Sequence, residues 1–336
     1  MKIIIPMAGW GTRLRPHTLT VPKPLVKVAG KTIVERLVEK ISESLQGKAR
    51  EVVFVIKPEF GAEVEKNLHE IAGRLGMKSH IRYQHEALGT AHAVYMAKDF
   101  LDGPVFIAYA DTLYDGNWHI NERSDAVILV KRVDKPEQFG VVTTDEKGHI
   151  VSFVEKPETF VSDLAIIGMY FFNRGEDLLK EIQYLMDHDI QKSGEYQLTD
   201  ALINLLNKGT VFFASPVDVW MDFGNKDAVI RSMKYILDAE TKKGVELIHP
   251  DVRLDNTETV SPVYIAEGVQ ISGGKIGPYV CIEKNSVLKN VELSDSMVGE
   301  NSILENLPLE NSMIGNHVVI RMPFRSLSIG DYSKLK

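Results

Sequence analysis

The sequence predicts an α/β protein whose mainly parallel sheet is covered by helices on both faces and is followed by a domain of a different kind. Short apolar runs alternate with helical stripes through the first third of the chain. The runs are apolar at almost every position, which is typical of strands buried on both faces. Later in the chain, aliphatic residues recur at a spacing of six. These observations indicate a Rossmann-like domain followed by a short parallel β-helix.

Composition limits the class of protein. The chain has 336 residues, 44% hydrophobic and 25% charged, which fits a globular protein of about two domains. Asp and Glu number 46 against 39 Lys and Arg, so the net charge of −7 argues against nucleic acid as a partner. No stretch approaches the roughly 18 apolar residues of a membrane span or has the form of a signal peptide, so we expect a cytoplasmic protein with no membrane partner. The single cysteine, Cys281, permits no internal disulfide.

The first half alternates strands and helices. Residues 2–8 form an apolar run that ends in a glycine-rich loop. A helix then begins at Thr32, where Thr32 and Glu35 make a T-x-x-E capping box, and apolar residues every four positions continue it to Leu45. Further strands are predicted at 51–56, 81–83, 105–111 and 126–131, and further helices at 60–75 and 90–101.

The pattern changes after residue 131. Two alternating strands flank the turn at 145–148, and the apolar run 165–172 predicts another strand. Helices at 176–188 and 195–207, a strand at 210–214 and a helix at 226–242 follow. We therefore divide the chain into a first domain of residues 1–242 and a second of residues 243–336.

The second domain contains a repeat. Aliphatic residues stand six apart at Ile276, Ile282 and Leu288, and in the pairs Ile265 and Ile271, Val298 and Leu304, and Ile314 and Ile320. Hexads of this kind build a parallel β-helix of a few coils. The spacing breaks at 271–276 and 288–298, which leaves an ordinary run of short strands as the alternative.

A glycine-rich turn with two arginines follows the first strand. The glycines of Gly9–Arg13 let the backbone approach a phosphate closely, and the arginines add charge-assisted donors. Two other phosphate motifs fail, because the dinucleotide fingerprint requires glycine at Leu14 and a P-loop requires glycine at Leu25. Two prolines flank Lys23 and stiffen its backbone, which a solvated loop lysine does not need.

The segment G-x-G-T-R-L-R-P, the later P-K-P-L-V-K-V-A-G-K and further motifs in the same order resemble the sugar-1-phosphate nucleotidyltransferases, or sugar-nucleotide pyrophosphorylases. The resemblance extends over residues 1 to about 240. Within the family, the chain resembles the glucose-1-phosphate thymidylyltransferases. Several branches of that family carry a left-handed β-helix, which fits the repeat. The resemblance implies an enzyme that transfers a nucleotidyl group from a nucleoside triphosphate to a sugar 1-phosphate and releases pyrophosphate.

The resemblance also implies which residues bind the nucleotide. Arg13 and the N–H groups of Gly11 and Thr12 would hold the leaving β- and γ-phosphates, and Lys23 would sit on the α-phosphate. Gln84 opens a segment that would read the base. The whole nucleotide-binding set is Ala8, Gly9, Gly11, Thr12, Arg13, Lys23, Gln84, Gly89 and Thr90.

Two aspartates are candidate metal ligands. Asp111 ends the predicted strand 105–111, and Asp222 follows the segment 217–221 in a similar setting. Carboxylates at strand ends beside a polyphosphate are natural ligands of Mg²⁺, since this ion takes carboxylate and phosphate oxygens together. The family uses such a pair, so we expect Asp111 and Asp222 to hold Mg²⁺ as the cofactor.

The sugar phosphate has its own residues in the family. Glu155 would accept hydrogen bonds from sugar hydroxyls, and Lys156 would bind the phosphate. Gly140 and Gly168 match glycines that pass close to the sugar. Ile166 stands where users of sugar acetamides carry asparagine, which favours an unsubstituted hexose. The implied catalytic set is Arg13, Lys23, Asp111 and Lys156.

Gln84 indicates which nucleotide the chain uses. A glutamine amide can accept from N3–H and donate to O4 of uracil or thymine, whereas guanine asks for a pair of acceptors such as a carboxylate. We therefore expect TTP or UTP, with glucose 1-phosphate as the second substrate. Glu86, two residues further on, keeps a mannose-1-phosphate guanylyltransferase that uses GTP as an alternative.

Two further alternatives come from other classes of protein. A catalytically silent homologue could bind a nucleotide sugar as a regulator, although it would be free to lose Arg13, Lys23 and the two aspartates. An acyltransferase could use His317 of the repeat region as a base. We expect the chain to act on its small-molecule substrates as a homo-oligomer.

Overall fold

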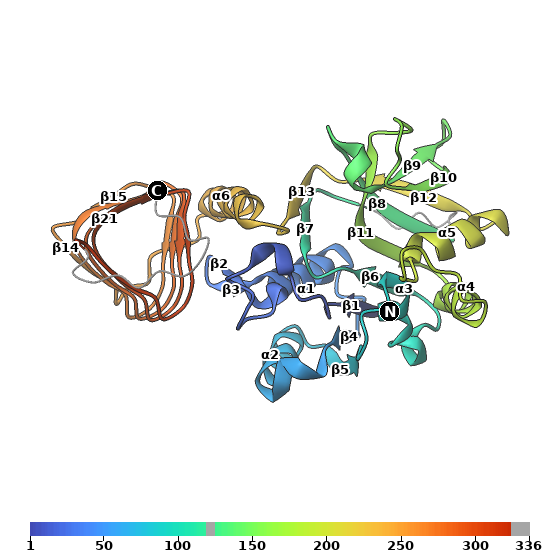
Figure 1. The fold of residues 1–336 in the computed structure, drawn as a ribbon, viewed down its shortest axis with the longest axis horizontal. Coiled ribbons are helices and arrows are strands. Elements are labelled where there is room, and N and C mark those ends of the chain that lie inside the picture. Colours follow the sequence, from blue (N-terminus) through green and yellow to red (C-terminus); the bar gives the residue numbers. More distant parts are fainter. Residues whose placement is uncertain (119–124, 324–336) are drawn as a thin grey trace. The chain divides into compact units, whose positions relative to one another are not determined.

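The computed structural model describes residues 1–118 and 125–323, which fall into two compact units (Figure 1). The first unit comprises Met1–Val26 and Thr32–Asp222, and the second comprises Lys27–Lys31 and Phe223–Lys336. This division differs from the predicted boundary after residue 242, because helix α6 (Lys226–Lys242) belongs to the second compact unit. Residues 324–336 of the predicted second domain lie outside the described residues.

A mixed sheet forms the centre of the first unit. In the described residues it has nine strands in the order β10-β9-β11-β6-β1-β4-β5, with β8 beside β11 and β12 beside β8. Its strands are β1 (Lys2–Pro6), β4 (Glu51–Ile56), β5 (Lys78–Tyr83), β6 (Val105–Ala108), β8 (Ala126–Arg132), β9 (Gly140–Thr144), β10 (Ile150–Glu155), β11 (Leu164–Phe172) and β12 (Phe212–Pro216). β5, β4, β1 and β6 are parallel neighbours, whereas β11 is antiparallel to β6 and β8. The carboxyl ends of the four parallel strands therefore meet at one edge.

Helices bury both faces of this sheet, as predicted. The helices of the unit are α1 (Ile33–Ser44), α2 (Gly61–Arg74), α3 (Thr90–Tyr95), α4 (Gly175–Asp187) and α5 (Leu198–Asn207). Ile4 and Val53 pack with residues of α3, α4 and α5 in one hydrophobic cluster. Ile3 and Phe54 point to the opposite face and are equally inaccessible to solvent, so that face is covered as well.

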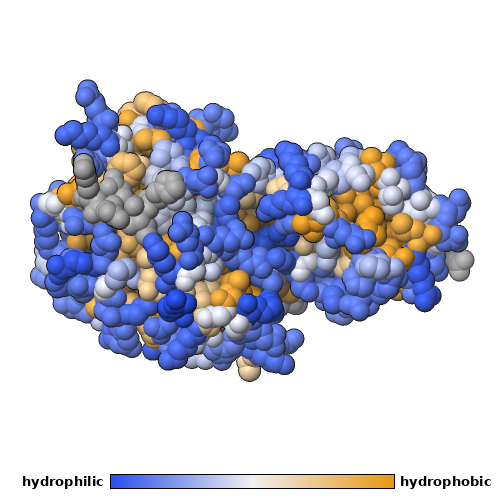
Figure 2. Space-filling view, turned by 180° about the vertical axis from the view of Figure 1, so that it is seen from behind, coloured by the Kyte–Doolittle hydropathy of each residue, from blue (hydrophilic) through white to orange (hydrophobic). Residues whose placement is uncertain are grey.

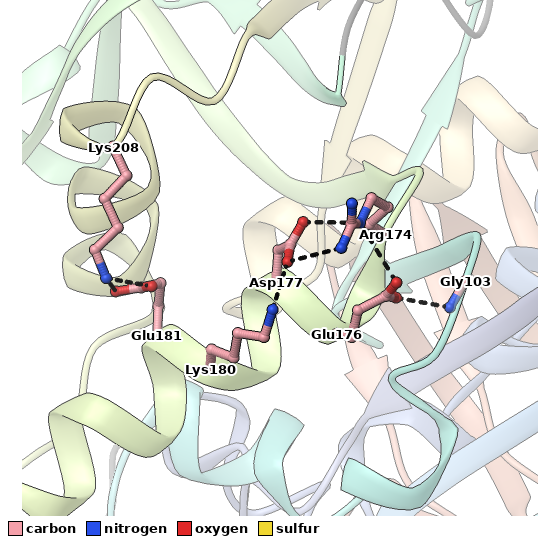
Figure 3. A network of polar contacts seen from close by, with 7 residues as sticks. All are labelled: Gly103, Arg174, Glu176, Asp177, Lys180, Glu181 and Lys208. Atoms are coloured by element: carbon pink, nitrogen blue, oxygen red, sulfur yellow. Dashed lines mark hydrogen bonds and ion pairs between the residues drawn. The ribbon is translucent and has the colours of Figure 1, made fainter.

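Ion pairs fasten α4 to its neighbours (Figure 3). Glu181 of α4 is buried, and its carboxylate accepts from the ammonium of Lys208, at the end of α5, at 2.6 and 2.7 Å. At the start of α4, Glu176 accepts from the N–H of Gly103 at 2.9 Å and pairs with Arg174. These contacts fix α5, whose first turn carries residues of the site described below.

Two predicted elements end earlier than expected. The run 105–111 is only partly a strand, because β6 ends at Ala108 and a second short strand, β7 (Thr112–Asp115), begins after Asp111. β7 pairs with β13 (Val219–Asp222) in a separate antiparallel sheet that the sequence did not reveal. The predicted helix 90–101 ends at Tyr95 and is followed by a 3₁₀ turn, Lys98–Phe100. An apolar stripe is compatible with both kinds of helix, so periodicity did not separate them.

The second unit contains a parallel β-helix. One of its sheets stacks β16 (Val263–Ile265), β18 (Val280–Ile282), β20 (Ser296–Val298) and β22 (Met313–Ile314). The other contains β14 (Arg253–Asp255), β15 (Glu258–Thr259), β17 (Gln270–Ile276), β19 (Val287–Ser294), β21 (Ile303–Glu310) and β23 (Val319–Arg321). The short strands β2 (Lys27–Val28) and β3 (Lys31–Thr32) complete the strands of the described residues.

The coils explain the irregular repeat. Ile265, Ile282, Val298 and Ile314 lie in register, so successive coils contain 17, 16 and 16 residues. In some sides of a coil, consecutive buried aliphatic residues are five positions apart and not six, as from Leu288 to Leu293. These shorter sides produce the breaks in the six-residue spacing. The stacked register excludes the alternative of an ordinary run of strands.

Residues with a left-handed backbone turn the corners of the β-helix. Gly268, Asn285, Asn301 and His317 occupy equivalent positions in successive coils, with φ of 74°, 58°, 54° and 57°. Glycine and asparagine tolerate this conformation better than most residues. The N–H of His317 donates to the carbonyl of Glu300 at 2.8 Å. The presence of His317 is therefore explained by its position at a corner of the β-helix, and no catalytic role is needed to explain it.

The surface seen in Figure 2 is mostly hydrophilic, as expected from a sequence in which 25% of the residues are charged. Figure 2 shows hydrophilic residues over most of one face, with hydrophobic residues in smaller patches. None of the helices in residues 1–118 and 125–323 combines the length and the apolar character that a membrane crossing requires.

Candidate functional site

Several loops begin at the carboxyl edge of the parallel strands. β1 leads to the glycine turn, β5 leads to Gln84 and β6 leads to Asp111. The N–H of Met7 donates to the carbonyl of Val55, and the N–H of Gln84 donates to the carbonyl of Ile56, both at 2.8 Å. Both loops are therefore hydrogen-bonded to the end of β4, and the predicted nucleotide-binding residues gather at this edge.

The glycine turn is shaped by the chain that follows it. Gly11 has φ 64°, and its carbonyl accepts from the hydroxyl of Thr18 at 2.8 Å. A Cβ at this position would lie 2.7 Å from the Cβ of Lys23. Glycine is thus required here by the approach of Lys23, a reason that the sequence did not show. Of the other predicted residues of the turn, Ala8 is buried and Gly9, Thr12 and Arg13 are exposed.

Lys23 is a buried cation with a carboxylate partner. It begins the 3₁₀ turn Lys23–Leu25 and is only 6% exposed. Its ammonium donates to Oδ2 of Asp111 at 3.0 Å, and the side chain of Asp111 is 46% exposed. A buried charge without a partner is costly, so this ion pair stabilises the turn. Lys23 is therefore not a solvated loop lysine.

Asp111 and Asp222 lie at the same end of the β7–β13 pair. Asp111 directly precedes Thr112, the first residue of β7, and Thr112 pairs with Asp222, the last residue of β13. Two neighbouring carboxylates are a donor set that fits a hard divalent cation sharing phosphate oxygens. Residues 1–118 and 125–323 hold no group of three His, Cys, Asp or Glu that could bind a metal. A cation here would therefore need oxygens from a substrate as well.

Gln84 is buried, and its amide is partly engaged. Its Nε2 donates to the carbonyl of Gly89 at 3.3 Å and lies 3.0 Å from Nδ1 of His92. Burial lowers the pKa of His92, against a smaller opposite effect of Glu86, which favours the neutral ring. Because an amide nitrogen can only donate, Nδ1 is the acceptor in this contact. Both amide protons are then used within the chain, and Oε1 remains. In this arrangement the predicted donation from Gln84 to O4 of a pyrimidine is not available, whereas acceptance from N3–H is.

The residues after Gln84 are tied to the start of α5. Gly89 has φ 105°, and a Cβ there would lie 2.5 Å from the backbone oxygen of Tyr196. The hydroxyl of Thr90 accepts from the N–H of Leu198 at 2.9 Å. Close packing against the backbone of Tyr196 therefore explains why residue 89 is glycine. The Thr90 hydroxyl caps the first N–H group of α5.

The β9–β10 hairpin brings Gly140 opposite Glu155. A Cβ at Gly140 would lie 2.9 Å from Oε2 of Glu155 and 3.5 Å from Cδ1 of Ile166. The hydroxyl of Thr199, in the first turn of α5, donates to the same Oε2 at 3.0 Å. Thr199 thus orients Glu155, and its place at a helix start is the only signal by which it could have been found from the sequence.

Lys156 has a strained backbone. Its φ is 44°, in the left-handed region, and its N–H donates to the carbonyl of Phe139 at 3.1 Å. Its side chain is exposed at the end of β10. Lysine adopts this conformation less readily than glycine or asparagine, so the surroundings of Lys156 hold it there.

Gly168 lies against Tyr109, a residue that the sequence analysis missed. The N–H of Tyr109 donates to the carbonyl of Gly168 at 3.0 Å. Gly168 has φ 77°, and a Cβ there would lie 3.0 Å from Cδ2 of the Tyr109 ring. Burial raises the pKa of the Tyr109 phenol, so the hydroxyl beside Thr90 stays protonated. The glycine is therefore required by the protein's own aromatic ring.

Comparison with known proteins identifies the family of this chain. Residues 2–239 match the family model described as Nucleotidyl transferase. The low-salt glycan biosynthesis nucleotidyltransferase of Haloferax volcanii is 30% identical over 326 residues, which cover 89% of this chain and 87% of that protein. The catalytic subunit beta of mannose-1-phosphate guanylyltransferase from Drosophila pseudoobscura pseudoobscura is 30% identical over 281 residues, 80% of this chain and 72% of that protein.

A solved structure shows the same fold. The crystal structure of the nucleoside-diphosphate-sugar pyrophosphorylase from Vibrio cholerae RC9 superposes with a TM-score of 0.60 at 22% identity, over 69% of this chain and 99% of that chain. The family match extends over most of the chain and includes both the glycine turn and the two aspartates. This chain belongs to the nucleotidyl transferase family.

Proposed function

We propose that this chain is a sugar-1-phosphate nucleotidyltransferase. In this reaction a phosphate oxygen of the sugar 1-phosphate bonds to the α-phosphorus of a nucleoside triphosphate, and the bond from that phosphorus to the bridging oxygen breaks to release pyrophosphate. The ion pair between Lys23 and Asp111 carries the proposal. It sets a cation, a carboxylate and an exposed glycine turn at the edge of the sheet where nucleotides bind in such folds.

The nucleotide would be held by groups of the turn. The reaction needs two anions aligned and the charge on the α-phosphoryl group neutralised, and no covalent enzyme intermediate. Arg13 and the N–H groups of Gly11 and Thr12 would bind the β- and γ-phosphates. Lys23 would contact the α-phosphate, and because Asp111 already fixes its ammonium, little reorganisation would be needed during the reaction.

Asp111 and Asp222 would hold Mg²⁺ together with phosphate oxygens. When bound, the ion would supply positive charge to the phosphate groups of the nucleotide. Asp111 would then have two roles, because it also orients the ammonium of Lys23.

The sugar 1-phosphate would lie toward β9, β10 and β11. Glu155 is oriented by Thr199 and would accept from sugar hydroxyls. Lys156 would bind the phosphate of the sugar, and its left-handed backbone sets the direction in which the side chain leaves β10. Gly140, Ile166 and Gly168 would form the wall beside the sugar, with the ring of Tyr109 behind Gly168.

Our first choice of substrates is TTP or UTP with glucose 1-phosphate. Oε1 of Gln84, which has no hydrogen-bond partner among the described residues, supports a base with a ring N–H, which uracil and thymine have at N3. Guanine also has such a group at N1, and the donors of Gln84 are already used. A GTP-dependent mannose-1-phosphate guanylyltransferase is therefore the second candidate, and one of the relatives bears that name.

A pyrophosphate-release screen tests the proposal. Purified protein with Mg²⁺ is offered TTP, UTP, GTP, CTP and ATP, each with glucose 1-phosphate, mannose 1-phosphate or N-acetylglucosamine 1-phosphate, or with no sugar. We expect release only when a sugar 1-phosphate is present. Hydrolysis that does not depend on the sugar would contradict a sugar-1-phosphate nucleotidyltransferase. Binding of nucleotide sugars without turnover of any pair would contradict the enzyme and favour a silent regulator.

A further inference from the structure

A second buried lysine lies at the same edge of the sheet. Among the described residues, the lysines that are buried are Lys23, 6% exposed, and Lys57, 8% exposed. Lys57 directly follows β4, which is the parallel neighbour of β1 and β5. Its position is therefore between the glycine turn and Gln84, and neither the sequence analysis nor the proposed mechanism assigns it a role.

The ammonium of Lys57 faces the glycine turn. Its Nζ lies 4.9 Å from the centre of the Trp10 ring, and Trp10 stands between the two glycines of the turn. The ring of Trp10 also meets that of Phe60 edge to face, with centroids 6.2 Å apart. A cation over an indole face is held in place by the ring, though far more weakly than by a carboxylate.

Lys57 differs from Lys23 in its partners. Lys23 has the carboxylate of Asp111, whereas Lys57 forms no ion pair with a carboxylate in the part of the chain that the structure describes. The side chain of Lys57 is mostly buried, but its ammonium contacts an aromatic ring and no carboxylate of the described residues, so its charge can serve an anion. The anion expected beside a glycine turn with exposed N–H groups is a phosphate chain.

We propose that Lys57 is a further triphosphate-binding residue, which binds the β- and γ-phosphates of the nucleotide and then the pyrophosphate product, and that Trp10 is the residue that positions it. This inference rests on the proposed function for the identity of the anion. It adds a cation from β4 to the one from Arg13, so that the leaving group is held from two sides of the turn. Trp10 is 43% exposed, which leaves the ring accessible at the rim of the site.

Binding of sodium tripolyphosphate, measured by titration calorimetry, tests the inference without relying on turnover. Lys57→Met keeps the apolar stem and removes the charge, and we expect it to weaken binding by about 10-fold or more, the value of a lost charge-assisted hydrogen bond. Lys57→Arg should retain most of the affinity. Trp10→Leu should weaken binding less than Lys57→Met does, and Trp10→Phe, which keeps an aromatic face, should be nearer to the wild type.

The chain offers a matched control. Nζ of Lys98 lies 4.9 Å from the centre of the Tyr95 ring, the same distance as in the Lys57–Trp10 pair. Lys98 belongs to the 3₁₀ turn that precedes β6, and not to a loop at the carboxyl ends of the strands. Lys98→Met removes a comparable cation–π contact and should bind tripolyphosphate like the wild type. In the forward reaction, Lys57→Met should raise KM for the nucleotide, while KM for the sugar 1-phosphate stays within about two-fold.

The outcomes separate the two proposals. Unchanged binding in Lys57→Met, or an equal loss in Lys98→Met, would overturn the role of Lys57 while an active wild type keeps the proposed function. Binding of tripolyphosphate that depends on Lys57, in a protein that fails the pyrophosphate-release screen, would support the anion site and contradict the enzyme. A wild type that does not bind tripolyphosphate at all would overturn the inference.

Discussion

The ammonium of Lys23 and the carboxylate of Asp111 lie 88 positions apart in the sequence and 3.0 Å apart in the structure. Lys23 belongs to the loop after β1 and Asp111 to the loop after β6, and these strands are parallel neighbours. The pair therefore joins two adjacent strand ends across the edge of the sheet. Asp222 reaches the same place through the β7–β13 pair.

We expect Asp111→Asn and Asp222→Asn each to lower kcat by about 100-fold or more at saturating Mg²⁺, because a metal acts on charge that peaks in the transition state. Steady-state pyrophosphate release checks this. Asp115→Asn is the matched control, since Asp115 also lies on β7 but pairs with Lys40 at 2.7 Å. A near-normal kcat in either of the first two variants would remove that aspartate from the metal site.

Gln84→Ala should raise KM for the preferred nucleotide. One hydrogen bond between neutral groups contributes about 0.5–1.5 kcal/mol, so kcat/KM should fall roughly 2- to 12-fold. Gln84→Glu should lose more, because a carboxylate cannot donate to the carbonyl of Gly89 or to neutral His92. The exposed Gln191→Ala serves as control. If Gln84→Ala leaves the ranking and KM of all five nucleotides unchanged, Gln84 does not read the base.

Acid should weaken both folding and nucleotide binding through His92. Its folded-state pKa is below the usual 6.5, so as the pH falls below 6.5 the unfolded state takes up a proton first and the free energy of unfolding decreases. His17 contributes in the same direction. Protonation of His92 also removes the acceptor that Nδ1 offers to Gln84.

The comparison of wild type with His92→Asn isolates this effect. Asparagine can accept from Gln84 but does not titrate near neutral pH. Between pH 7.5 and 5.5, KM for the nucleotide should rise more steeply in the wild type than in the variant, with the titration of the nucleotide itself common to both. Parallel profiles would show that His92 is not part of the base-reading contact.

Gly168→Ala should destabilise the protein more than Gly47→Ala. Both glycines have positive φ, 77° and 68°, so both substitutions carry the cost of a left-handed alanine, about 1 kcal/mol. A Cβ at Gly168 meets the Tyr109 ring at 3.0 Å, whereas a Cβ at Gly47 meets nothing within 4 Å. Thermal melts of the two variants measure the difference. Equal melting temperatures would mean that the ring of Tyr109 moves aside without cost.

The local elements and the glycine turn after the first strand could be predicted from the sequence alone. Apolar runs identified the strands of the parallel sheet, and the Thr32–Glu35 capping box placed the start of α1, where the Thr32 hydroxyl accepts from the Glu35 N–H at 3.2 Å. The six-residue aliphatic spacing predicted the β-helix, although the sides of five residues interrupted that spacing. These signals are readable because helix and strand periods, caps and glycine turns depend on residues close together in the chain.

The contacts between residues far apart in the sequence could not be predicted in this way and were found in the structure. The β7–β13 pair, which brings Asp222 beside Asp111, consists of four-residue strands too short to give a periodic signal. Glycine is required at positions 11 and 168 because the side chains of Lys23 and Tyr109 approach from other segments. The amide of Gln84 is engaged because His92, in the first turn of α3, lies beside it. Such contacts are fixed by the packing of whole elements, which a pattern of neighbouring residues does not record.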